Sequence, residues 1–224
     1  DITQTAGINS NTQDWCTGVT IIDINSDGYQ DIFISRSGWF ENDQQNKLSN
    51  LLFVNNKDLT FTESASKYGF TDQSRSNQAC FFDMDNDGDL DMYQVNQPAD
   101  KKLFLLNKIP KKDYSLFRDR IYRNVNGKFI DVSKEVGISR NFGYGLSVNA
   151  SDFNNDGWID LYVANDYAEP DFMYYNNGDG TFKNVINEKL KHITQLSMGS
   201  DTGDINNDGN IDLFTTDMTP EDHY

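Results

Sequence analysis

The chain repeats one pattern of apolar and polar positions four times. In each copy a short apolar run leads into nine mostly polar residues, and a second apolar run follows. Val19-Thr-Ile-Ile and Asp31-Ile-Phe-Ile form the first such pair, and Ala79-Cys-Phe-Phe and Asp91-Met-Tyr-Gln-Val form the second. β-Branched and aromatic residues dominate these runs, which favours strands. Each copy therefore predicts two strands joined by a polar loop.

A second pair of strands is predicted after each of the first three loops. Leu51-Leu-Phe-Val-Asn-Asn followed by Thr60-Phe-Thr-Glu indicates a hairpin, and similar runs begin at Ile121 and Phe172. Asn-Gly and Asp-Gly pairs favour tight hairpin turns, and they occur at 126–127, 177–178 and 179–180. Each full repeat thus contains about four strands.

The period of the repeat predicts the fold class. The loops start at residues 23, 83, 152 and 204, so they are 60, 69 and 52 residues apart. A four-stranded antiparallel sheet repeated at this period is typical of a β-propeller blade. We expect an all-β chain that forms a partial propeller of about three full blades and two fragments. A β-sandwich is the alternative, although a sandwich does not impose a long repeat.

The repeat also predicts boundaries. Asp1-Ile-Thr-Gln-Thr-Ala-Gly-Ile8 matches Asp131-Val-Ser-Lys-Glu-Val-Gly-Ile138, so residues 1–8 resemble the end of a blade. The expected units are 1–14 (end of a preceding blade), 15–72, 73–140, 141–195 and 196–224 (start of a further blade). Such an arc exposes strand edges, and we expect more of the polypeptide or a partner chain to cover them.

The nine-residue loops carry the candidate chemistry. Each has oxygen-bearing side chains at its first, third, fifth and ninth positions and glycine at its sixth. Hard cations such as Ca²⁺ take six to eight oxygen ligands, and a short loop supplies them only if it turns sharply. We therefore expect up to four structural Ca²⁺ ions. The predicted side-chain ligands are Asp23, Asn25, Asp27, Asp31, Asp83, Asp85, Asp87, Asp91, Asp152, Asn154, Asp156, Asp160, Asp204, Asn206, Asp208 and Asp212.

The loops differ from EF-hands. An EF-hand needs flanking helices and a glutamate at the twelfth loop position. Here that position is occupied by Ile34, Gln94, Val163 and Thr215, none of which is acidic. The 83–91 loop has the most carboxylates, so we expect it to bind Ca²⁺ most tightly and to be the most destabilised without it.

Composition narrows the function classes. The net charge is −16, from 35 Asp and Glu against 19 Lys and Arg, which argues against nucleic acid as a partner. A disordered acidic chain is excluded because 37% of residues are hydrophobic and they are patterned. No apolar run approaches the length that a bilayer requires. The two cysteines, Cys16 and Cys80, lie in predicted strands, where buried free thiols are expected and a disulfide stays open.

One segment has the opposite charge sign. A basic insertion at about 100–120 lengthens the second repeat, and it indicates either a solvated loop or a docking loop for an acidic partner or anionic glycan. Its basic residues are Lys101, Lys102, Lys108, Lys111, Lys112, Arg118 and Arg120.

The loops between strands resemble FG-GAP/VCBS repeats, which are calcium-binding propeller blades. Tyr175-Asn-Asn-Gly-Asp-Gly-Thr-Phe182 and the segment Phe129–Ile138 are similar to the cartilage-acidic-protein-like VCBS proteins of Bacteroidetes, which often carry an ASPIC/UnbV domain. The resemblance implies a secreted or cell-surface protein, with anchoring in the outer membrane through another segment as one form of it. It also implies that the seventh loop position binds Ca²⁺ through its carbonyl, and these residues are Tyr29, Asp89, Trp158 and Asn210.

The sequence leaves three alternative functions. The first is a calcium-stabilised, non-catalytic binding or scaffold module that recognises a protein or glycan. The second is a polysaccharide lyase or hydrolase on a propeller, and the third is an accessory subunit of an outer-membrane complex. An enzyme needs a positioned base and acid. The two histidines, His192 and His223, lie in polar surroundings, and no catalytic residue is assigned, so the binding module is preferred.

Overall fold

The computed structural model describes residues 1–8, 15–37, 49–98, 117–138, 143–167 and 169–218. Within these ranges the chain is all-β, with three four-stranded antiparallel sheets, one two-stranded sheet and two short helices. The strands of each sheet follow one another in sequence order. This is the blade architecture that the repeat predicted, and the sandwich alternative is wrong.

Most strands coincide with an apolar run of the repeat, whereas β13 of the fourth sheet is mostly polar. The first sheet contains β1 (Cys16–Ile22), β2 (Asp31–Arg36), β3 (Leu51–Asn55) and β4 (Phe61–Glu63). The second contains β5 (Ser76–Phe82), β6 (Asp91–Asn96), β7 (Arg120–Asn124) and β8 (Phe129–Asp131). The third contains β9 (Tyr144–Ser151), β10 (Asp160–Asp166), β11 (Phe172–Asn176) and β12 (Phe182–Asn184). The fourth contains β13 (Ser197–Gly203) and β14 (Asp212–Asp217).

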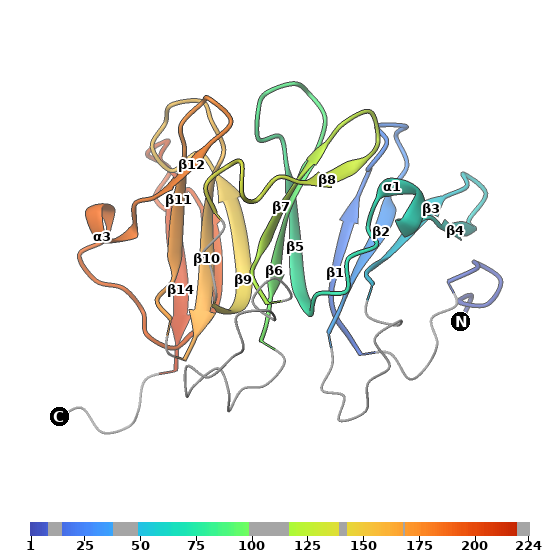
Figure 1. The fold of residues 1–224 in the computed structure, drawn as a ribbon, viewed down its shortest axis with the longest axis horizontal. Coiled ribbons are helices and arrows are strands. Elements are labelled where there is room, and N and C mark those ends of the chain that lie inside the picture. Colours follow the sequence, from blue (N-terminus) through green and yellow to red (C-terminus); the bar gives the residue numbers. More distant parts are fainter. Residues whose placement is uncertain (9–14, 38–48, 99–116, 139–142, 168, 219–224) are drawn as a thin grey trace.

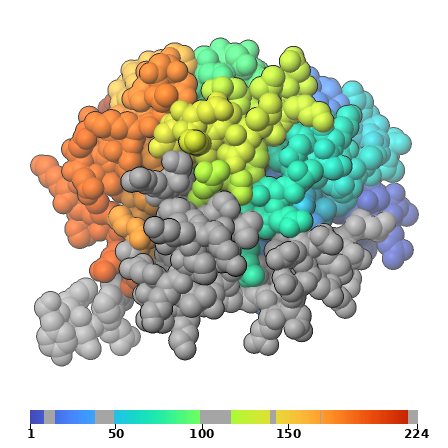
Figure 2. All heavy atoms as spheres, viewed as in Figure 1, coloured from blue at the N-terminus to red at the C-terminus, as the bar shows by residue number. Residues whose placement is uncertain are grey.

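The sheets stand side by side as blades (Figure 1). Their first strands are neighbours across the blades: the Thr20 hydroxyl on β1 donates to the Ala79 carbonyl on β5 at 2.8 Å, and Ser147 on β9 lies 2.8 Å from Ser200 on β13. All four nine-residue loops project from the same end of the blades, which is the top in Figure 1. In the space-filling view the blades follow one another from blue to orange-red across the face (Figure 2).

The core lies between blades. Successive side chains of a strand point to opposite faces, so each inner strand contributes to two interfaces. On β6, for example, Met92 packs in the cluster shared with the first blade, whereas Tyr93 packs in the cluster shared with the third, and both are fully buried. Burying apolar faces in this way requires blades on both sides.

The fourth sheet shows what happens on an uncovered face. Phe214 occupies the same repeat position as Phe33, Tyr93 and Tyr162. These three side chains are at most 1% exposed, whereas Phe214 is 59% exposed. Among the described residues no further sheet packs on that side of β14.

Short tails connect the blades. α1 (Ala65–Tyr68) follows the first sheet, and α3 (Ile186–Lys189) follows the third. The tail at 132–138 contacts the next blade, because Phe182 N–H donates to the Val136 carbonyl at 2.8 Å. Residues 1–8 contact the first blade in the same way, through Phe61 N–H and the Ala6 carbonyl at 2.8 Å.

In each tail a glycine lies at the point where the tail backbone contacts the backbone of the next blade. A Cβ atom added at Gly7 would lie 2.7 Å from the Phe61 carbonyl oxygen, and one added at Gly69 would lie 2.7 Å from that of Phe129. Both glycines also have positive φ, 75° and 97°. These positions therefore exclude any side chain.

The hairpin turns are only partly as predicted. Val125 and Lys128 exchange backbone hydrogen bonds, and residues 126–127 have φ of 55° and 78°, as in a two-residue type I′ turn. The pairs at 177–178 and 179–180 instead share one five-residue loop, closed by Asn177 N–H donating to the Thr181 carbonyl at 2.9 Å. The Asp179 carboxylate accepts from the Thr181 hydroxyl at 2.6 Å, which stabilises the longer loop.

Within the described part of the chain, neither cysteine forms a disulfide. Cys16 is exposed, so the expectation of a buried thiol is wrong there, while Cys80 is partly buried. Burial raises the pKa of the Cys80 thiol to about 11. A search of the described residues finds no helix long and apolar enough to cross a bilayer.

Candidate metal centre

The four loops share one hydrogen-bond frame. In every loop the first aspartate accepts from the backbone N–H groups of the fifth and sixth residues, which folds the loop around its carboxylate. In the first loop Asp23 accepts from Asp27 at 2.9 Å and from Gly28 at 2.7 Å. The corresponding distances are 3.2 and 2.9 Å, 3.1 and 2.8 Å, and 3.0 and 2.9 Å in the other three loops.

The glycine at the sixth position is needed for its backbone conformation. Its φ is 85°, 91°, 87° and 85° in the four loops, a left-handed conformation that costs glycine little. A Cβ atom at any of these glycines would meet nothing within 4 Å. The sequence pattern therefore selects glycine for its conformation and not for space.

The ninth-position aspartate joins the loop to two strands. Asp91 starts β6, its Oδ2 accepts from Met84 N–H at 2.9 Å, and its Oδ1 accepts from Asn124 N–H on β7 at 2.8 Å. Asp31 and Asp160 make the same two contacts, with third-strand distances of 2.7 and 2.8 Å. Each of the three is at most 1% exposed. The closing carboxylate is thus buried and held by the sheet.

The third strand was the partner that sequence reasoning missed. Its last residue is asparagine in all three full blades: Asn55, Asn124 and Asn176. Two of these side chains also donate to backbone carbonyls, Asn55 Nδ2 to Gln30 at 3.1 Å and Asn176 Nδ2 to Met84 at 2.7 Å. A shared asparagine at the end of each third strand is the signal that could have identified it.

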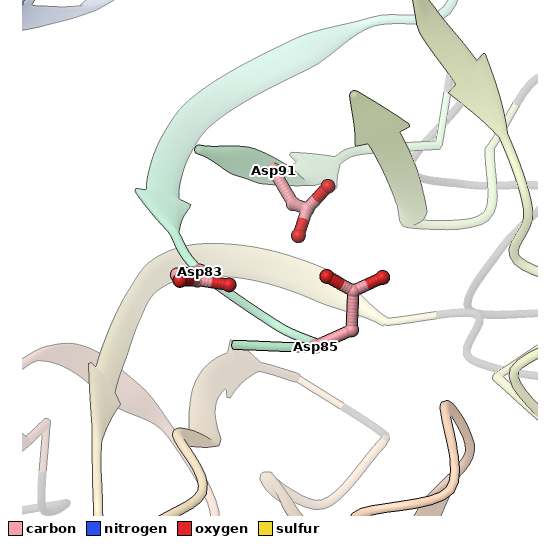
Figure 3. A group of neighbouring side chains, drawn as sticks. All are labelled: Asp83, Asp85 and Asp91. Carbon is pink, nitrogen blue, oxygen red and sulfur yellow. The ribbon is translucent and has the colours of Figure 1, made fainter. Parts of the chain in front are cut away.

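The second loop brings three carboxylates together. One oxygen each from Asp83, Asp85 and Asp91 lies within 4.8 Å of the others (Figure 3). In the close-up the Asp85 and Asp91 carboxylates face each other across the loop. Asp87 does not join this group of atoms, and its Oδ1 accepts from Asp89 N–H at 2.9 Å.

The donor set of this loop fits a hard cation. The Oδ1 atoms of Asp85 and Asp89 are buried and accept no hydrogen bond. A buried carboxylate oxygen without a partner costs free energy, and a cation bound there would remove that cost. Oxygen-only donors of this kind suit Ca²⁺ better than Zn²⁺, which prefers nitrogen and sulfur.

Burial and crowding raise the pKa values of the same carboxylates. Desolvation raises the pKa of Asp91 to about 6, opposed by its two backbone hydrogen bonds and reinforced by Asp85 and Asp89. Desolvation also raises the pKa of Asp160 to about 6, and it raises the pKa values of Asp85 and Asp89, with neighbouring carboxylates adding to each. A bound divalent cation would reverse these shifts because it favours the ionised form.

Two side-chain cations approach the loops. Lys57 lies 3.3 Å from Asp27 Oδ2 in the first loop, and Arg123 Nε lies 3.4 Å from Asp85 Oδ2 in the second. Both come from the hairpin of the same blade. They relieve part of the negative charge without supplying the several ligands that a metal ion binds.

The first, third and fourth loops have asparagine at their third position, and in the first Asn25 Oδ1 accepts from Asp27 N–H at 3.1 Å. Asn154 Oδ1 accepts from Asp156 N–H at 2.9 Å, and Asn206 Oδ1 accepts from Asp208 N–H at 2.9 Å. At the seventh position of the third loop, Trp158 packs against the 177–181 hairpin loop, and a Cβ atom on Gly178 would lie 2.8 Å from its ring. At the seventh position of the first loop, Tyr29 lies under Lys57, 5.0 Å from ring centre to Nζ.

The basic insertion is only partly described. Residues 99–116, and with them five of its lysines, lie outside the described residues. Arg118 and Arg120 are described, and they form ion pairs with Asp131 at 3.1 and 2.6 Å; Arg120 also contacts Asp72 at 3.0 Å. These two arginines therefore neutralise acids of their own fold.

The histidines form no catalytic pair in the described part of the chain. His192 is exposed and lines a cavity of about 420 Å³ beside Tyr162, Met173 and Leu213, between the third and fourth sheets. His223 lies outside the described residues.

Comparisons with known proteins bear on the repeat. No curated protein matches the chain. Among solved structures, a lectin of Agrocybe aegerita, described for its specific recognition of non-reducing terminal N-acetylglucosamine, is similar with a TM-score of 0.46 and 17% identity. The similarity covers 88% of this chain and 45% of the lectin, so the chain spans less than half of that protein. Residues 152–215, which contain the third and fourth loops, match the family model of the FG-GAP-like repeat, and this match supports the FG-GAP family.

Proposed function

We propose that the chain is a calcium-stabilised, non-catalytic binding or scaffold module in which the ions hold each blade together. The observation that supports it most is the second loop, where three carboxylates converge and two buried carboxylate oxygens have no hydrogen-bond partner. The other three loops share its backbone frame. Side chains at positions one, three, five and nine, with the carbonyl at position seven, would supply the ligands.

The role of the ions would be structural. In the three full blades the closing aspartate already connects its loop to the third strand, so an ion bound there would stabilise a junction of three backbone segments. A coordination sphere filled by the protein leaves no position for a reacting water, in contrast with a catalytic metal. Sites of extracellular modules bind Ca²⁺ with dissociation constants of about 10⁻⁴–10⁻³ M, which suits a secreted or surface location.

Chelation tests the calcium part of the proposal. The chain is melted in about 5 mM Ca²⁺ and again after extensive dialysis against a chelator. Four sites, each at a Ca²⁺ concentration about ten times the dissociation constant, would together contribute roughly 6 kcal/mol, so the melting temperature and the protease resistance should both fall markedly. Mg²⁺ at the same concentration is the control, because its octahedral preference fits these loops poorly. Unchanged melting and proteolysis would refute the structural role.

The partner is proposed by class. The loop end of the blades presents a broad face of turns, and such faces bind proteins or glycans in many folds. A screen of immobilised proteins and of neutral and acidic glycans would separate the two functions left open. Retention without turnover supports the module, whereas turnover of a polysaccharide would favour the lyase or hydrolase.

A further inference from the structure

The four loops form a row at one end of the blades, and some neighbouring loops touch (Figure 1). The contacts come from the fourth loop position, which is not among the predicted ligands. Asn155 in the third loop donates from Nδ2 to Asn210 Oδ1 in the fourth at 2.8 Å. Asn86 in the second loop donates from Nδ2 to the Gly157 carbonyl in the third at 3.4 Å.

Both contacts continue to a predicted ligand of the next loop. Asn210 donates from its own Nδ2 and from its backbone N–H to Asp208 Oδ1, at 2.9 and 2.8 Å. In the third loop, the peptide that accepts from Asn86 donates its Trp158 N–H to Asp156 Oδ1 at 2.9 Å. Each chain of hydrogen bonds therefore ends on the fifth-position carboxylate of the following loop.

The backbone explains why this residue can reach its neighbour. The fourth position is left-handed in every loop, with φ of 54°, 58°, 60° and 58° for Ser26, Asn86, Asn155 and Asn207. Asparagine tolerates this conformation better than most residues. Serine is shorter, and within the described ranges no hydrogen bond joins Ser26 to the second loop.

We propose that Asn86 and Asn155 are positioning residues that couple neighbouring cation loops. An ion that orders one loop fixes its fourth residue, and this residue in turn holds a group of the next loop that donates to the fifth-position carboxylate: the peptide between the sixth and seventh residues in the third loop and the seventh residue in the fourth. Hydrogen bonds in such a chain strengthen one another. The second, third and fourth loops then bind cations cooperatively, while the first loop binds independently. This inference rests on the proposed calcium binding.

The third loop carries its own reporter. Tb³⁺ takes the place of Ca²⁺ in oxygen-rich sites, and a nearby indole sensitises its emission, so Trp158 reports Tb³⁺ bound in the third loop. Excitation at the red edge of the tryptophan band avoids the tyrosines. Trp158→Phe keeps the backbone carbonyl and must abolish the signal, which verifies the assignment.

The test is a double-mutant cycle. The fourth loop is disabled by Asp204→Asn with Asp208→Asn, and Tb³⁺ affinity at the third loop is measured in wild type and in Asn155→Ser, which installs the natural residue of the first loop. Coupling is reciprocal, so loss of the fourth site should weaken the third about threefold to tenfold in wild type, and less than about twofold in Asn155→Ser. Asn207→Ser is the matched control, since within the described ranges no hydrogen bond joins Asn207 to another loop.

Each outcome decides one question. An equal loss of affinity in both backgrounds, or no loss in wild type, overturns the coupling while leaving calcium binding intact. Absence of Tb³⁺ and Ca²⁺ binding by calorimetry would instead overturn the proposed function. Circular dichroism verifies that Asn155→Ser folds, and Asn155→Gly, which also accepts the left-handed backbone, provides a second variant.

Discussion

The two ends of the second blade each bury an aspartate, and they do so in opposite surroundings. At the loop end Asp91 accepts two backbone N–H groups, and its pKa is raised to about 6 by desolvation and by neighbouring carboxylates. At the other end Asp119 accepts from the Tyr93 hydroxyl and from Asn96 N–H, both at 2.8 Å. Its pKa is raised to about 7 by complete burial, with no carboxylate among the causes.

The difference separates two ways of neutralising a buried charge. Asp91 lies within a group of acids that one proton cannot neutralise, so a divalent cation suits it. Asp119 is a single acid beside hydrogen-bond donors, and one proton is sufficient. The third blade repeats the hydrogen bonds of Asp119, since Asp171 accepts from the Tyr162 hydroxyl and from Asn165 N–H. The first blade has no buried acid at this place. Phe33 has no hydroxyl, and the neutral Asn50 takes the position of the aspartate and accepts from Arg36 N–H at 3.0 Å.

The largest expected effect is a change in the pH dependence of stability in Asp119→Asn. Because the folded pKa is above the unfolded value near 3.8, the folded state holds a proton between about pH 4 and pH 7. Stability from this group is therefore greatest below pH 4 and falls as pH rises to about 7, by roughly 2–4 kcal/mol in total. The asparagine variant should lose this fall.

Chemical denaturation of both proteins at several pH values, with Ca²⁺ present, provides the measurement. The free energy of unfolding of the variant should rise relative to wild type between pH 4 and pH 7 and stay level above it. Parallel pH profiles would show that Asp119 holds no proton near neutral pH.

The next effect is a calcium-dependent loss of stability in Asp91→Asn. With Ca²⁺ the variant lacks a proposed ligand and should be less stable by about 2 kcal/mol, the contribution of one site with a dissociation constant of about 10⁻⁴ M in about 5 mM Ca²⁺. Without Ca²⁺ it removes one of several crowded acids but leaves one of two buried backbone N–H groups without an acceptor, so its loss of stability should be clearly smaller. Thermal melts with and without chelator test this, and a loss of the same size in both would argue against a cation at this end.

A smaller effect is expected for Tyr93→Phe, which installs the aromatic residue of the first blade. It removes the hydroxyl that donates to Asp119, so stability above pH 7 should fall by about 1–2 kcal/mol, and the pKa of Asp119 should rise further. The loss should shrink at pH 5, where the carboxyl is protonated. An equal loss at both pH values would indicate a packing defect instead.

The smallest effect is expected for Lys57→Ala at the loop end. Lys57 is half-exposed and contacts Asp27 at 3.3 Å, so its ion pair is screened by water. A bound cation makes it redundant, and the melting temperature should shift only in chelator. Lys183→Ala, which breaks an exposed pair with Glu188 that includes no predicted ligand, is the control and should not respond to Ca²⁺.

The loop end of the blades could be predicted from the sequence, whereas the buried aspartate at the opposite end could not. Position-specific oxygens and glycine in four copies indicate converging loops, and strands on either side follow from residue type. Asp119 gave no such signal, because it lies between Arg118 and Arg120 in a run that resembles a solvated basic loop. In the structure both arginines pair with acids of the fold, and Asp119 is fully buried.

Two features of the loop end could not be predicted from the sequence either. The closing Asp91 accepts from Asn124, a contact across 33 residues that depends on the register of the third strand. The hairpin at 177–181 is longer than its Asn-Gly and Asp-Gly pairs suggest, because the Thr181 hydroxyl bonds to Asp179. Local pairs predict that a turn occurs, whereas side-chain contacts decide its length.

The tail glycines have a consequence for the shape of the whole array. Gly7 and Gly69 let one blade's tail touch the carbonyl of the next blade's outer strand without an intervening side chain. The pitch from blade to blade at the rim is therefore set by two backbones in contact. Side-chain exchanges in the core can be absorbed locally, but a single methyl group at Gly69 would open the rim and change the curvature with which successive blades wind around their axis.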